Sequence, residues 1–215
     1  MKYILMDLDG TITDPKEGIT KSIQYALKFW NIEVDDLDTL CKFIGPPLRD
    51  SFMDFYGFSV TEAEEAVKKY REYFEVTGLY ENIVYNGMEN LLSSVKALGK
   101  KLIVATSKPE LMAKKILQHF ELAQYFDDIC GATMDGSRSS KEEVIRYALE
   151  KNNIVELAAT IMVGDRKYDI EGAKQVGLSS IGVLYGYGDR DELAFAGADK
   201  IVSTVKELQE LLTGE

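Results

Sequence analysis

The sequence predicts a doubly wound α/β fold, in which helices cover both faces of a parallel sheet, together with a smaller helical block. One sign is the apolar run Tyr3–Met6, which lacks Gly, Pro and charge and is typical of a strand buried on both faces. The other is the alternation of helical and strand patterns from about residue 86 onward, which indicates right-handed crossovers between parallel strands. We expect the core to comprise residues 1–14 and 81–215, and the helical block to comprise residues 15–80.

The helical block follows the first strand directly. Apolar residues recur at helical spacing over residues 17–30, after a turn at Asp14-Pro15, and predict an amphipathic helix. The pair Pro46-Pro47 predicts a rigid loop, because two prolines fix φ and remove two donors. Thr61 and Glu64 have the spacing of a capping box, which predicts a helix from there to about residue 74.

The core pattern continues to the end of the chain as alternating elements. The predicted strands are residues 101–106, 128–132, 160–165, 180–184 and 200–202. The predicted helices are residues 87–98, 110–120, 140–152, 166–176 and 205–212.

Composition limits the partners of the protein. With 36 acidic and 25 basic residues the net charge is -11, and such a surface repels nucleic acid and anionic membranes. A small anionic substrate is compatible with this charge if a metal ion and local cations receive it. Cys41 and Cys130 show no metal-site or redox spacing and are expected to be reduced thiols. The first apolar run is too short for a signal peptide, and no run approaches the ~20 residues of a membrane span, so we expect a cytoplasmic protein, monomeric or weakly dimeric.

Two carboxylates end the first strand. Asp7 and Asp9 have one residue between them, so they share a face if strand geometry persists. In an open parallel sheet ligands gather beyond the carboxyl ends of the strands. A simple turn would also explain Asp followed by Gly10, so the pair indicates a site only together with other residues at the same edge.

A hydroxyl pair ends a second predicted strand. Thr106 and Ser107 follow the run of residues 102–105, and Pro109 comes next but one. A Ser/Thr helix cap is one interpretation, and a ligand-binding hydroxyl at the sheet edge is the other.

A lysine begins the helix predicted at residues 140–152. Lys141 follows Ser139 and Ser140, and Ser139 and Glu142 have capping-box spacing. A lysine at a helix N-terminus opposes the helix dipole by several tenths of a kcal/mol, and an anion nearby would compensate. A solvated surface lysine is the alternative.

Two more carboxylates follow the strand of residues 160–165. A capping turn would explain Asp165 or Asp169 but not both. Two carboxylates ~4 Å apart repel by about 1 kcal/mol in water and about 4 kcal/mol at an effective dielectric near 20. Asp7, Asp9, Asp165 and Asp169 therefore could not all stay ionised in one cleft without a cation, and a hard ion that prefers oxygen ligands, Mg²⁺, is expected.

These stretches, in this order, resemble the four signatures of the haloacid dehalogenase-like hydrolases. The first is Asp7–Thr11, the second ends at Thr106, the third is Lys141, and the fourth is Gly164–Asp169. The segments 182–188 and 196–199 resemble the phosphoglycolate phosphatase-like branch. The resemblance spans the core and, more loosely, the insertion. It implies a Rossmann-like core, a helical cap inserted after the first signature, and a Mg²⁺-dependent phosphatase acting on a small phosphorylated metabolite.

The resemblance also implies roles for single residues. Asp7 would attack phosphorus and form an aspartyl-phosphate, and Asp9 would serve as general acid and then general base. Thr106 and Lys141 would hold the transferring phosphoryl group. The implied metal ligands are Asp7, Asp9, Asp165 and Asp169.

Substrate contacts are expected from both parts of the chain. Thr11 and Ser107 lie within the signatures, and Gly45 and Arg49 lie beside the Pro-Pro loop. Arg49 could reach an anionic group of the substrate, although a solvated arginine that begins a helix is equally compatible.

The sequence leaves several activities open. Phosphoglycolate and a nucleoside 5'-monophosphate both suit the branch resemblance. A phosphosugar mutase of the same superfamily would share all four signatures, and a phosphometabolite-binding protein without catalysis is the alternative from another class. Asp9 argues against a haloalkanoic acid dehalogenase, which would lack this second carboxylate.

Overall fold

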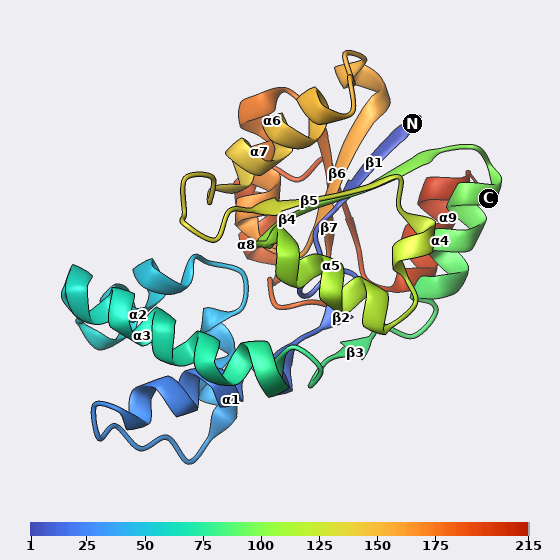
Figure 1. The fold of residues 1–215 in the computed structure, drawn as a ribbon. Coiled ribbons are helices and arrows are strands. Elements are labelled where there is room, and N and C mark those ends of the chain that lie inside the picture. The colour runs from blue at the N-terminus through green and yellow to red at the C-terminus, as the bar shows by residue number, and fades with distance from the viewer. Residues whose placement is uncertain (215) are drawn as a thin grey trace. The chain divides into compact units, whose positions relative to one another are not determined.

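The computed structural model describes residues 1–214, and the chain forms two compact units. One unit contains Met1–Asp14 and the chain from Val84 onward, and the other is Pro15–Ile83. The short strands β2 (Thr13–Asp14) and β3 (Ile83–Val84) pair as a separate two-stranded sheet. Figure 1 shows the elements of both units.

The first unit is built on a six-stranded sheet with the order β5-β4-β1-β6-β7-β8, in which every pair is parallel. Its strands are β1 (Tyr3–Met6), β4 (Lys101–Pro109), β5 (Asp128–Ala132), β6 (Thr160–Gly164), β7 (Ser179–Val183) and β8 (Lys200–Val202). Met6 pairs with Val104 on one side and with Val163 on the other, so β1 and β6 end at nearly the same level, whereas β4 continues as far as Pro109. The strand order changes direction beside β1, which is where ligands bind in open α/β sheets.

Helices cover both faces of this sheet, as the sequence predicts (Figure 1). They are α4 (Met88–Ala97), α5 (Glu110–His119), α6 (Lys141–Lys151), α7 (Lys167–Val176), α8 (Arg190–Ala196) and α9 (Val205–Thr213). Helices α6 and α7 pack on one face, where Leu5, Ile103 and Val144 belong to one buried cluster. Helices α4 and α9 lie together on the other side. The four residues of β1 are all buried, as a strand between two helical layers requires.

In the second unit, the residues from Pro15 to Asn82 form helices, turns and irregular segments, without a strand. The helices are α1 (Lys16–Lys28), η1 (Leu37–Phe43), α2 (Leu48–Tyr56), α3 (Val60–Tyr73) and the single π-helical turn η2 (Phe74–Gly78). Phe43 and Phe52 are fully buried within it, with ring centroids 5.1 Å apart. Gly18 allows α1 to approach η2, because a Cβ there would lie 1.9 Å from the carbonyl oxygen of Gly78.

The structure corrects both predicted capping boxes. Helix α3 is capped by Ser59 with Glu62, and helix α6 is capped by Ser140 with Glu143. The predictions of Thr61 with Glu64 and of Ser139 with Glu142 were therefore wrong by two residues and by one residue. The physical reason is that a capping residue keeps an extended backbone, as Ser59 and Ser140 do here.

Two α-helices were not predicted. Helix α2 begins directly after Pro47, where the sequence predicted a rigid loop and offered a helix start at Arg49 only as an alternative, and α8 lies in a stretch to which no element was assigned. Both are short, at 9 and 7 residues, so their periodic patterns were too brief to recognise.

Two expectations from composition can be compared with the structure. Cys41 and Cys130 are both free thiols, as expected. No helix within residues 1–214 combines the length and the apolar character needed to cross a membrane.

Candidate functional site

A buried lysine lies between two aspartates at the carboxyl edge of the sheet. Lys141 Nζ is 2.8 Å from Asp7 Oδ1 and 2.7 Å from Asp169 Oδ1. It also donates a hydrogen bond of 3.0 Å to the carbonyl oxygen of Ala105 in the middle of β4. Only 3% of the Lys141 side chain is exposed. The anion that a lysine at this helix start requires is thus supplied by two carboxylates.

Three carboxylates converge at this place. Asp7, Asp165 and Asp169 each offer one oxygen, and these oxygens lie within 4.8 Å of one another. All three residues are buried. Asp7 follows β1 and Asp165 follows β6, whereas Asp169 lies in the first turn of α7. Because β1 and β6 are neighbouring parallel strands, their carboxyl ends lie together. Asp7 and Asp165 therefore meet, although they are 158 positions apart in the sequence (165 minus 7).

Two glycines leave room for these carboxylates. A Cβ on Gly164 would lie 2.1 Å from Asp169 Cγ, and one on Gly10 would lie 2.1 Å from Asp165 Oδ2. Gly10 also has φ of +83°, a conformation that favours glycine. The backbone N–H of Arg166 donates to Asp169 Oδ2 at 3.1 Å and fixes that side chain against the start of α7.

Asp165 is held by neutral donors. Its Oδ1 accepts a hydrogen bond of 3.3 Å from the Thr11 hydroxyl, and its Oδ2 accepts one of 2.8 Å from the backbone N–H of Tyr187. Thr11, predicted to bind substrate, thus contacts a predicted metal ligand. Tyr187 was not singled out from the sequence, because it acts through its backbone and no side-chain pattern marks it.

Asp9 forms an ion pair with a different lysine, Lys108. Its Oδ2 is 2.6 Å from Lys108 Nζ, and it does not belong to the group of three carboxylates. Sequence reasoning missed Lys108. The rule that selected Thr106 and Ser107 applies equally to the next residue of Thr-Ser-Lys, because β4 continues as far as Pro109.

The hydroxyl residues of β4 lie at the same edge. Thr106 is buried, and its Oγ1 accepts a hydrogen bond of 3.2 Å from the backbone N–H of Lys108. The Thr106 hydroxyl proton is therefore not used in that bond and can be donated to an anion. Ser107 is half-buried.

Gly45 and Arg49 belong to the second unit. Gly45 has φ of +110°, and Arg49 Nε is 3.2 Å from Asp50 Oδ1. The Arg49 side chain is 57% exposed. Their proposed contact with substrate stays a prediction.

Two of the three carboxyl groups, Asp165 and Asp169, have a raised pKa. Burial raises the pKa of Asp165 well above its usual range, and Asp169 and Asp7 raise it further. Burial also raises the pKa of Asp169, to about 6, although Lys141 lowers it. Burial alone would lower the pKa of Lys141, but Asp169 and Asp7 shift it to above its ordinary value. This arrangement favours an added positive charge.

The donor set fits a divalent cation. When all three are ionised, Asp7, Asp165 and Asp169 carry three negative charges, and Lys141 balances one of them. The remaining two charges match one divalent ion. Carboxylate oxygens are the ligands that Mg²⁺ prefers, and Mg²⁺ commonly uses few protein ligands because it retains waters.

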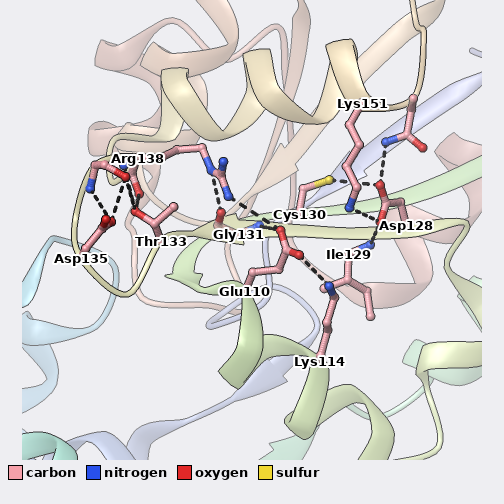
Figure 2. A network of polar contacts seen from close by, with 12 residues as sticks. Glu110, Lys114, Asp128, Ile129, Cys130, Gly131, Thr133, Asp135, Arg138 and Lys151 are labelled. Carbon is pink, nitrogen blue, oxygen red and sulfur yellow. Dashed lines mark hydrogen bonds and ion pairs between the residues drawn. The ribbon is translucent and has the colours of Figure 1, made fainter.

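The segment that leads to Lys141 is held by an arginine (Figure 2). Arg138 Nε donates to the carbonyl oxygen of Gly131 at 2.9 Å, and its guanidinium lies 3.8 Å from Glu110 Oε2. The same guanidinium lies 3.6 Å from the ring centroid of Tyr147. The loop between β5 and α6 is thus attached to both β5 and α5.

The metal-free protein is expected to lose stability as the pH rises. The folded-state pKa of Asp165 and Asp169 lies above the unfolded value, so the folded state holds protons that the unfolded state releases. The free energy of unfolding that Asp169 contributes is greatest below about pH 4 and falls as the pH rises through about 6. The contribution of Asp165 falls in the same direction as the pH rises. With a chelator present, Asp165→Asn should therefore raise the free energy of unfolding at pH 8 by about 1–3 kcal/mol. This change corresponds to a rise in melting temperature of roughly 2–10 °C.

Thermal unfolding at pH 5 and at pH 8 measures this effect. Exposed Asp35 provides the matched control as Asp35→Asn, for which no change is expected. A lower melting temperature for Asp165→Asn than for wild type at pH 8 would contradict the repulsion argument.

Fold and site together define a protein with a doubly wound α/β core, an inserted helical unit, and a lysine among three carboxylates at the edge of its sheet. The chain belongs to the haloacid dehalogenase-like hydrolases, because the model of that family matches residues 4–183.

Similar proteins narrow this assignment. A 5'-nucleotidase of Pseudomonas aeruginosa is 49% identical over 190 residues, which are 88% of this chain and 86% of that protein. A phosphoglycolate phosphatase of Aquifex aeolicus is 30% identical over 87% of this chain and 86% of its own length. A solved structure described as a predicted phosphatase from Clostridium acetobutylicum is 52% identical, covers 100% of this chain and 99% of its own, and has a TM-score of 0.97. The chain is thus a phosphatase of the phosphoglycolate phosphatase-like branch.

One relative is named as a kinase rather than as a phosphatase. The tyrosine-protein kinase PtkA of Mycobacterium tuberculosis (strain ATCC 25618 / H37Rv) is 36% identical over 98% of this chain and 72% of its own length. Its name concerns phosphoryl transfer to protein rather than hydrolysis.

Proposed function

We propose that the protein is a Mg²⁺-dependent phosphatase that hydrolyses nucleoside 5'-monophosphates through an aspartyl-phosphate on Asp7. The observation that supports this most is the position of Asp7 at the end of β1, in ion contact with Lys141 and beside Asp165 and Asp169. The 49% identical 5'-nucleotidase supports the substrate class. Asp7, Asp165 and Asp169 would hold Mg²⁺, which supplies charge stabilisation to the transferring phosphoryl group.

In the first step Asp7 attacks phosphorus. A bond forms between an Asp7 carboxylate oxygen and phosphorus while the ester P–O bond breaks, and its electron pair goes to the leaving oxygen. Asp9 donates the proton that this oxygen takes up. Burial raises the pKa of Asp9, although Lys108 opposes the rise, and a raised pKa helps a carboxyl group to carry a proton near neutral pH.

In the second step water attacks the aspartyl-phosphate. Asp9, now a carboxylate, accepts a proton from that water, and the bond between phosphorus and Asp7 breaks. Lys141 and the Thr106 hydroxyl hold phosphoryl oxygens in both steps. Hydrolysis of phosphate monoesters is among the slowest uncatalysed reactions, so both a nucleophile and charge stabilisation are needed.

We assign substrate selection to the helical unit. Pro15–Ile83 would act as a cap that excludes water in the first step and admits it in the second. Gly45 and Arg49 would contact the part of the substrate beyond the phosphate, with Thr11 and Ser107 contributing from the core.

Phosphoglycolate is the second candidate substrate, supported by the 30% identical phosphoglycolate phosphatase. Transfer to protein tyrosine is a third possibility, supported only by the name of PtkA. A phosphosugar mutase and a binding protein without catalysis remain the alternatives. Cytoplasmic location, the monomeric or weakly dimeric state, and the lack of nucleic-acid and membrane partners remain predictions from composition.

A substrate panel tests the proposal. Purified protein is incubated with Mg²⁺ and, in turn, with nucleoside 5'-monophosphates, phosphoglycolate and phosphosugars, and inorganic phosphate is measured. We expect phosphate release that is fastest with a nucleoside 5'-monophosphate and that EDTA abolishes. Faster release from phosphoglycolate would overturn the substrate class, and phosphosugar interconversion without phosphate release would favour the mutase. Incubation with ATP and a tyrosine-containing protein, read by phosphotyrosine detection, tests the kinase alternative.

A further inference from the structure

Lys108 is a nearly buried lysine to which the mechanism above gives no task. Its side chain is 5% exposed, and its Nζ lies 2.6 Å from Asp9 Oδ2. The Asp9 side chain is itself only 13% exposed. Buried charges are retained when they are paired, so this pair is a built feature of the site rather than a surface contact.

We propose that Lys108 is the positioning residue of the general acid, because its ammonium fixes the Asp9 side chain in the orientation that serves the leaving oxygen. With Oδ2 held by Lys108, the other oxygen, Oδ1, is the one that exchanges the proton. This inference rests on the proposed function, in which Asp9 protonates the oxygen released when the ester P–O bond breaks.

The second oxygen of Asp9 supports this orientation. Asp9 Oδ1 is buried and has no hydrogen-bond partner within residues 1–214. An unpaired buried carboxylate oxygen is costly, and a substrate oxygen that shares a proton with it would remove that cost. The two oxygens of Asp9 are thus distinct, one bound to Lys108 and one available.

The backbone around Lys108 is held firmly enough for such a task. Strand β4 continues through Lys108 with an irregular register between Thr106 and Pro109. The Lys108 N–H donates to Thr106 Oγ1 at 3.2 Å. A Cβ on Gly131 of β5 would lie 2.6 Å from the Lys108 carbonyl oxygen, so β5 packs directly on this peptide. A group on a paired strand can position a partner more accurately than a group on a loop.

Leaving-group dependence separates positioning from other roles. An alkyl ester releases a strongly basic alkoxide and needs a positioned acid, whereas p-nitrophenyl phosphate releases a weakly basic phenolate and hardly needs one. A lysine that only bound phosphate, or only supported the fold, would affect both esters equally.

The experiment compares kcat/KM for two esters, because kcat/KM reports the steps through the first phosphoryl transfer. The esters are p-nitrophenyl phosphate and the alkyl phosphate that the wild-type protein hydrolyses fastest. For Lys108→Met we expect a loss of about 10–100-fold with the alkyl ester, and of less than about threefold with p-nitrophenyl phosphate. Lys108→Arg should recover part of the loss. Asp9→Asn should show the same discrimination, and adding Lys108→Met to it should cause little further loss.

Lys114→Met is the matched control. Lys114 forms an ion pair of the same 2.6 Å length with Glu110, and Figure 2 shows this pair. Neither ester should be affected by the control. Equal losses with both esters in Lys108→Met, or no loss with the alkyl ester, would overturn the inference. If the wild-type protein hydrolysed neither ester, the proposed function would fail instead.

Discussion

Asp7→Asn is expected to reduce phosphate release by at least about a thousandfold, because an amide cannot attack phosphorus and the two-step route is lost. The substitution changes no side-chain volume and removes one of three clustered negative charges. The folded protein should therefore remain at least as stable as wild type. The measurement is kcat for the best substrate of the panel, with inorganic phosphate as the readout.

Two further measurements support this prediction. Wild-type protein quenched in acid during turnover should carry phosphate that is sensitive to hydroxylamine, as an acyl phosphate is, and Asp7→Asn should carry none. Circular dichroism provides the control for folding. Turnover of folded Asp7→Asn within tenfold of wild type would remove Asp7 from the nucleophile role.

Lys141→Met should damage both activity and stability. The substitution leaves Asp7 and Asp169 buried without their cation, and removing one partner of a buried pair costs about 3–5 kcal/mol. In chelator the melting temperature should fall by roughly 6–20 °C. Activity with Mg²⁺ should fall by about 10²–10³-fold, because in the proposed mechanism this charge stabilises the transition state.

The double variant Lys141→Met with Asp169→Asn keeps this test informative if the single variant unfolds. Because the double variant also removes one carboxylate, its melting temperature should be closer to that of wild type than the melting temperature of Lys141→Met is. Its activity should remain low. Mg²⁺ should raise the melting temperature of Lys141→Met more than that of the double variant. A single variant as stable as wild type in chelator would show that the lysine does not balance these carboxylates.

Much of the fold could be predicted because the core obeys simple patterns. Strands β1, β5 and β8 begin and end at the predicted residues, and the other core strands differ by up to three residues at their ends. Buried strands are short apolar runs, and turn residues bound them clearly. Helix starts were less accurate because several neighbouring Ser, Thr and Glu residues satisfy the same spacing rule. Tertiary contacts and backbone conformation decide between them.

The candidate site was predictable to the extent that it follows from strand order. Asp7, Asp165 and Lys141 lie at strand ends or at a helix start, and parallel topology brings such positions to one edge. Lys108 was missed because the predicted strand ended at Thr106, whereas β4 continues with an irregular register through Lys108 to Pro109. The contact of Tyr187 with Asp165 could not be predicted, since a backbone N–H leaves no mark in the sequence.

The contacts of Lys141 have a consequence for folding. One ammonium group links α6 to Asp7 directly after β1, to Ala105 in the middle of β4, and to α7, which are segments distant along the chain. Slow amide exchange in these segments should therefore be lost together, in one cooperative opening, rather than by separate fraying of each element. A ligand that binds this edge would slow exchange in all of them at once.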